Sequence, residues 1–111
     1  MKLNDTIVAQ STPTGIGAIG IIRLSGKNSI KIVNTLFPSK DLSKVDSHTI
    51  HYGNIENKGL IIDEVLVSIF KEPNSYTKEN IVEISCHGAD FIIKKILSLT
   101  IILGARVADK G

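Results

Sequence analysis

The stretch TPTGIGAIGIIRLSG, residues 12–26, carries the G-x-G-x-x-G spacing of dinucleotide-binding loops at Gly15, Gly17 and Gly20. In such a loop a helix begins at the third glycine, and its N-terminus binds the pyrophosphate. Here the glycines lead instead into an isoleucine-rich run, and β-branched residues of this kind favour a strand. The stretch therefore predicts a turn entering a strand over residues 19–25, without the helix that a dinucleotide site needs.

The bulk composition is that of one ordinary globular domain. The chain has 111 residues, of which 42% are hydrophobic and 22% charged. The net charge of +2 is too small to indicate a nucleic acid or a membrane surface as the partner. Cys86 is the single cysteine, so no internal disulfide can form, and a reducing compartment fits. We expect a cytoplasmic protein that does not enter a membrane, because the apolar run IIKKILSLTIIL is short and interrupted by two lysines.

The hydrophobic pattern predicts strands and two helices along the chain. The apolar residues of KNSIKIVNTLF, residues 27–37, have helical spacing, and Pro38 ends that helix. HGADFIIKKILSLTIILG, residues 87–104, is the clearest helix and closes on a glycine. Alternation and turn residues predict the strands, which span residues 5–10, 19–25, 48–56, 60–70, 81–86 and 105–108, with a hairpin turn at 57–59.

This order of elements predicts an α+β fold, in which one mixed sheet packs against two helices. A strand, a helix, three strands, a second helix and a last strand follow a short first strand, and we expect two split β-α-β units. The chain stops shortly after ILGARVADKG enters its last strand, so we also expect a fragment of a longer protein.

Four residues could carry chemistry, and each has an ordinary structural interpretation. Arg23 lies within an isoleucine-rich strand, and Glu83 lies within IVEIS on the face opposite Val82 and Ile84. Both could simply sit on a wet face, or pair with each other. Cys86 is more often a small buried hydrophobe than a nucleophile, and His87 at a strand-to-helix corner more often makes a cap.

Neither a catalytic residue nor a metal site is predicted. His48 and His51 are three residues apart, which in a strand places them on opposite faces, and the chain has no second cysteine. The residues alone indicate an α+β domain with a polar pocket and no more specific function.

Four stretches taken together resemble a known family. They are DTIVAQSTPTGIGAIGIIRLSG, IIDEVLV, PNSYTKENIVEISCHG and LGARVADKG, and they resemble the N-terminal domain of the tRNA-modification GTPases MnmE, also called TrmE. The resemblance runs in order over nearly the whole chain. It implies that residues 1–111 form a tetrahydrofolate-binding and dimerisation domain, with a fold like the folate-binding domain of the glycine-cleavage aminomethyltransferase.

The resemblance also implies the setting of this domain. The full protein would add a helical domain with an inserted GTPase domain, which would hold GTP, magnesium and potassium. With the flavoprotein MnmG, also called GidA, it would modify carbon-5 of the wobble uridine of tRNA, using the one-carbon unit of a 5-formyl- or methylene-tetrahydrofolate. The domain itself would form a homodimer.

Two site residues carry over by position. Arg23 matches the family's folate-contacting arginine, and Glu83 matches its folate-contacting glutamate. A third contact, a lysine, would follow Gly111. A carboxylate can accept the adjacent amino and ring N–H groups of a pterin in a fork, and an arginine suits the ligand's carboxylates or its ring carbonyl.

The sequence departs from the family at four places, which bear on folate affinity. Thr14 replaces a proline and Ile16 a basic residue, TKEN at residues 77–80 replaces TGED, and Ala89 and Asp90 alter the start of the second helix. An alternative is therefore a dimerisation scaffold with a degenerate folate pocket. A stand-alone aminomethyltransferase relative is disfavoured, because that enzyme is much longer and this chain offers no obvious general base.

Overall fold

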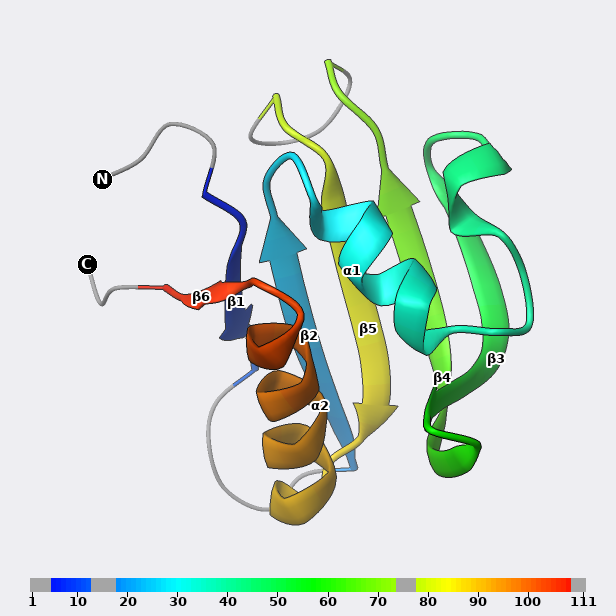
Figure 1. The fold of residues 1–111 in the computed structure, drawn as a ribbon, viewed down its shortest axis with the longest axis vertical. Coiled ribbons are helices and arrows are strands. Elements are labelled where there is room, and N and C mark those ends of the chain that lie inside the picture. The colour runs from blue at the N-terminus through cyan, green and yellow to red at the C-terminus, as the bar shows by residue number, and fades with distance from the viewer. Residues whose placement is uncertain (1–4, 13–17, 74–77, 109–111) are drawn as a thin grey trace.

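The computed structural model describes residues 5–12, 18–73 and 78–108, drawn as a ribbon in Figure 1. Its strands are β1 (Ile7–Gln10), β2 (Ile19–Ser25), β3 (Thr49–Asn57), β4 (Leu60–Phe70), β5 (Ile81–His87) and β6 (Arg106–Val107). Its helices are α1 (Ser29–Leu36), α2 (Asp90–Ile102) and a short 3-10 turn, η1 (Leu42–Lys44).

The strands form one mixed sheet in the order β3-β4-β5-β2-β1-β6. Every neighbouring pair is antiparallel except β1 and β6, which are parallel. Both helices lie on the same face of this sheet (Figure 1), where α1 contacts β5 and β3 and α2 contacts β1, β2, β4 and β5. The predicted α+β class, a mixed sheet against two helices, is confirmed.

The expectation of two split β-α-β units is only half correct. β5, α2 and β6 form one such unit, because β5 and β6 run in the same direction with β2 and β1 between them. The connection from β2 through α1 to β3 instead joins strands of opposite direction, with β5 and β4 between them. The order of elements along a chain does not fix strand direction, which here follows from three successive antiparallel pairings.

A strand, not a helix, follows the glycine-rich stretch, as predicted. Gly15 and Gly17 lie outside the described residues, whereas Gly20 lies within β2. A Cβ atom at Gly20 would meet Cδ1 of Ile93 in α2 at 2.7 Å. This glycine therefore lets the helix approach the strand closely. Close packing accounts for a glycine at position 20, and no bound nucleotide is needed to explain it.

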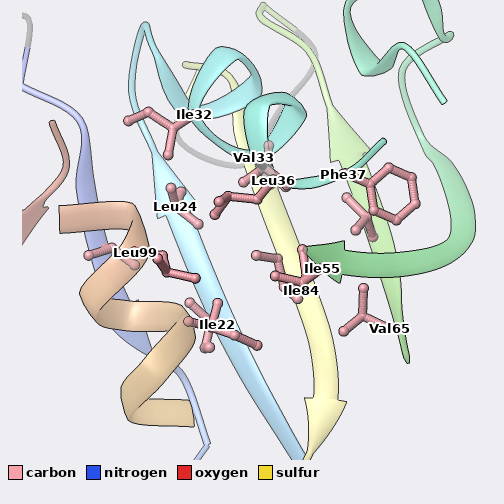
Figure 2. Close-up of a cluster of buried hydrophobic side chains, with 14 of the residues drawn as sticks. Ile22, Leu24, Ile32, Val33, Leu36, Phe37, Ile55, Val65, Ile84 and Leu99 are labelled. Carbon is pink, nitrogen blue, oxygen red and sulfur yellow. The ribbon is translucent and has the colours of Figure 1, made fainter. Parts of the chain in front are cut away.

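Alternation along the central strands builds the core between the sheet and the helices. Val65, Val67 and Ile69 of β4 face the helices, as their spacing predicts. Figure 2 shows the side chains of the strands meeting those of the helices in this layer. The fully buried large side chains are Phe37, Ile22, Leu24, Leu42, Ile55, Ile69, Ile84, Ile96, Val8, Val33, Val67 and Val82.

The boundary between the fifth strand and the second helix differs from the prediction, and several other boundaries shift by one or two residues. β5 continues to His87, so α2 begins at Asp90 instead of residue 87. Leu103 lies beyond the end of this helix and is 39% exposed, whereas Leu99 within the helix is buried. The predicted turn at 57–59 is confirmed: Lys58 and Gly59 both have positive φ angles, as the hairpin turn with the right twist requires.

The face of the sheet opposite the helices is not covered by any described element. Because side chains alternate along a strand, every second residue points to this open face while its neighbours point into the core. Several large apolar side chains are exposed there, which is unusual for a face that meets only water. They are Ile19, Ile50, Tyr52 and Leu66.

Candidate functional site

Arg23 and Glu83 meet at the centre of this open face. They occupy directly opposite positions of β2 and β5. Nε and Nη2 of Arg23 both donate to Oε2 of Glu83, at 2.8 and 2.5 Å. The side chains are 47% and 25% exposed, so the pair lies half in solvent. The two residues that the sequence singled out are thus brought together.

The same alternation that builds the core places this pair on the open side. Ile22 and Leu24 flank Arg23 in β2, and both are fully buried under the helices. Val82 and Ile84 flank Glu83 in the same way in β5. A strand whose odd and even residues face opposite sides must point Arg23 and Glu83 away from the core.

A hollow of about 320 Å³ adjoins the pair, lined by Arg23, Phe70, Ile81 and Glu83. Phe70 and Ile81 are cross-strand neighbours at the end of β4 and the start of β5. The hollow thus has an apolar part at Phe70 and Ile81 and a charged part at Arg23 and Glu83. Ile81 and Glu83 are two residues apart along β5. Small-molecule sites commonly combine apolar walls with a few polar groups in this way.

The Glu83 carboxylate keeps acceptor capacity in this arrangement. Arg23 bonds only Oε2, and no described residue donates a hydrogen bond to Oε1. A ligand with adjacent N–H groups could therefore bond to Oε1 while the guanidinium occupies Oε2.

A second hollow of about 370 Å³ lies further along the same face, between Ile19, Leu66 and His87. On its rim the Tyr52 hydroxyl donates to the Glu64 carboxylate. This hydrogen bond and the negative charge of Glu64 raise the pKa of Tyr52.

A buried carboxylate fixes His87 at the end of β5. Oδ2 of Asp63 accepts the backbone N–H of His87 at 2.8 Å, and Oδ1 lies 2.7 Å from Nδ1 of its ring. Asp63 is only 8% exposed, while the His87 side chain is 68% exposed. We expected the His87 side chain to cap a neighbouring element. Instead, Asp63 contacts both the backbone N–H and the ring of His87.

Cys86 behaves as a buried apolar residue, as the sequence indicated. Its side chain is buried against Gly20, whose carbonyl lies 3.5 Å from Sγ. Burial, with a smaller contribution from the Asp63 charge, raises the pKa of the thiol to about 11. Cys86 and His87 point to opposite sides of β5, so they do not form a catalytic pair.

His48 and His51 fall on different surfaces. His48 precedes β3 and packs against Phe70, whereas His51 lies opposite Val67, a core position of β4. Within the described ranges, no three histidine, cysteine or acidic side chains gather as metal ligands. Among the helices in those ranges, none is long and apolar enough to cross a membrane.

Sequence reasoning missed Asp63 and Phe70. The signal for Asp63 was present, because it occupies a core-facing position in the alternation of β4, where a carboxylate needs hydrogen-bonding partners. Phe70 gave no signal, since its role depends on the strands paired beside it. The departures Thr14, Ile16 and Thr77 lie outside the described residues.

The fold and site define a class: a small α+β domain with helices on one sheet face and an Arg–Glu pair in a hollow of the other. The model of one family, described as GTP-binding protein TrmE N-terminus, matches residues 6–111. The chain belongs to this family.

Individual relatives agree with this assignment. The chain is 56% identical over 107 residues to the tRNA modification GTPase MnmE of Cytophaga hutchinsonii, covering 96% of this chain and 23% of that protein. It is 51% identical over 110 residues to the MnmE of Flavobacterium johnsoniae, covering 96% and 24%. Against the MnmE of Streptococcus thermophilus it is 52% identical over 107 residues, again covering 96% and 24%. The chain thus spans about a quarter of the length of these relatives.

Proposed function

We propose that this chain is the folate-binding and dimerisation domain of a tRNA-modifying GTPase. The observation that carries the proposal is the Arg23–Glu83 pair at the mouth of a hollow on the open sheet face. A carboxylate with one oxygen that bonds to no described residue suits the adjacent N–H groups of a pterin, and Phe70 and Ile81 suit its apolar faces. The ligand is a tetrahydrofolate derivative, of the 5-formyl or methylene form.

The reaction belongs to the whole protein. Because relatives of about four times this length are named tRNA modification GTPases, we propose that a GTPase domain elsewhere in the full protein hydrolyses GTP with magnesium and potassium. In the cytoplasm, with the flavoprotein MnmG, the full protein transfers a folate one-carbon unit to carbon-5 of the wobble uridine of tRNA. We also propose that the fold resembles the folate-binding domain of the glycine-cleavage aminomethyltransferase.

The open face supports the dimer. Ile19, Tyr52 and Leu66 are exposed there around the second hollow. Two-fold dimers are the commonest oligomers of soluble proteins, and a dimer formed through this face would bury these side chains. Pairing two copies through it would also enclose the Arg23–Glu83 hollow and exclude water from the ligand.

Calorimetric titration of the 111-residue chain with 5-formyltetrahydrofolate tests the proposal. Saturable binding is expected, at one ligand per chain. The alternative, a dimerisation scaffold with a degenerate pocket, predicts a dimer in light scattering and no heat of binding. GTP and NAD serve as controls, and saturable binding of either at micromolar concentration would contradict the interpretation of the glycine-rich stretch.

A further inference from the structure

Phe70 supplies the aromatic surface of the first hollow. It is the last residue of β4 and stands directly opposite Ile81 of β5. Along β5 the apolar Ile81 and the charged Glu83 are two residues apart on one face, a separation of about 7 Å. A flat ring whose edge bonds to Glu83 would therefore extend over Phe70.

His48 holds the ring of Phe70 from one side. Their ring centroids are 5.2 Å apart and the ring planes are perpendicular. In a perpendicular contact the edge of one ring meets the face of the other, so His48 covers at most one face of the phenyl ring. The contact orients Phe70 without closing its surface to a ligand.

The position of His48 is fixed by its own contacts. Its backbone N–H donates to the carbonyl of Ile69 at 2.7 Å. Its Nδ1 lies 2.8 Å from the hydroxyl of Ser47, which also accepts the backbone N–H of Lys71 at 2.8 Å. His48 is thereby tied to both residues that flank Phe70 in the chain.

The backbone of His48 is in an uncommon conformation. Its φ angle is +64°, in the left-handed region that few residues other than glycine adopt. Such a conformation persists where surrounding contacts impose it, and it concentrates at binding sites. The loop is held in a form that presents the imidazole to Phe70.

We propose that Phe70 is the stacking surface for the ligand of the Arg23–Glu83 site, and that His48 is the residue that positions it. This inference rests on the proposed function, which it deepens by naming a specificity determinant. The part of the ligand that lies over Phe70 is the pterin, a nitrogen heterocycle with N–H donors on one edge. Stacking favours planar rings, so Phe70 contributes more to the binding of a fully conjugated pterin than to that of the puckered tetrahydro form.

Calorimetry with folic acid and 5-formyltetrahydrofolate on Phe70→Leu tests the stacking. Leucine keeps an apolar wall but has no aromatic face. The affinity for folic acid should fall roughly 2- to 10-fold, and that for the tetrahydro form should fall less, so that the ratio of the two affinities changes. Phe70→Tyr keeps the ring and should stay within about twofold of the parent for both ligands.

His48→Ala tests the positioning role, with His51→Ala as the matched control on the other face of the sheet. His48→Ala should change the ratio of affinities in the same direction as Phe70→Leu, and His51→Ala should leave it unchanged. In the double variant of Phe70 and His48 the losses should not add, because both act through one ring.

Three results would overturn the inference, and one separates it from the proposed function. Equal loss of both ligands in Phe70→Leu would assign Phe70 a merely structural role, and parent-like affinities would remove it from the site. An unchanged ratio in His48→Ala would remove the positioning role. If Phe70→Leu fails to fold, His48→Ala decides the question. Failure of the parent chain to bind either folate would instead contradict the proposed function, and the inference with it.

Discussion

Arg23 and Glu83 stand directly opposite each other on neighbouring antiparallel strands, and two of the three guanidinium nitrogens, Nε and Nη2, donate to one carboxylate oxygen. The other oxygen bonds to no described residue. The pair therefore combines a surface ion pair with an unused acceptor beside an apolar hollow. It is better suited to holding a ligand than to holding the fold together.

The ion pair should contribute little to stability. A double-mutant cycle with Arg23→Met and Glu83→Gln, measured by urea denaturation, should give a coupling free energy below about 1 kcal/mol, because both side chains are partly in solvent. High salt should reduce this coupling further, since solvent-exposed charges are screened. A coupling above about 2 kcal/mol would assign the pair a structural role instead.

Asp63 should contribute far more to stability than the exposed pair. Asp63→Ala leaves the backbone N–H of His87 without its acceptor, and we expect the free energy of unfolding to fall by about 1–3 kcal/mol. His87→Ala should cost less, because that backbone hydrogen bond survives. Asp46→Ala, at an exposed position, is the control and should change the free energy by no more than about 0.5 kcal/mol.

Cys86 should resist alkylation in the folded protein. Its pKa of about 11 exceeds pH 8 by about three units, so roughly one thiol in a thousand is the reactive thiolate at that pH. Iodoacetamide should modify the native chain very slowly and the urea-denatured chain rapidly, as followed by mass spectrometry. Equal rates in both states would mean that the thiol is accessible and unperturbed.

Self-association should depend on the open sheet face. Leu66→Lys places a charge among Ile19 and Tyr52, and it should shift the molar mass in light scattering towards the monomer. Ile102→Lys, an exposed apolar position at the end of α2, is the matched control and should leave the mass unchanged. A dimer that tolerates Leu66→Lys would place the interface elsewhere.

Local patterns predicted most of the fold, because alternation and turn residues are visible along one segment. The β2 strand, the turn at Lys58 and Gly59, and the buried Val65, Val67 and Ile69 all follow from such patterns. The direction of β3 relative to β2 did not follow, because it depends on pairing between segments far apart in the chain. The start of α2 was placed too early because Asp63, from another strand, holds His87 in β5.

The site was predictable only in part for the same reason. Arg23 and Glu83 were recognisable as polar residues inside apolar strands, and their faces followed from alternation. Their direct opposition depends on the register between β2 and β5, which no single segment encodes. The contact between His48 and Phe70 likewise joins residues 22 positions apart through the folding of β3 onto β4.

The central claim is that Glu83 anchors a folate through its carboxylate, and calorimetry with 5-formyltetrahydrofolate on Glu83→Gln tests it most directly. Gln replaces one acceptor oxygen with a donor that would face the ligand's own N–H groups. Binding should weaken by roughly 2–5 kcal/mol while the chain folds like the parent. Glu56→Gln, far along β3, is the control and should bind like the parent. Parent-like affinity in Glu83→Gln would remove Glu83 from the site and contradict the account.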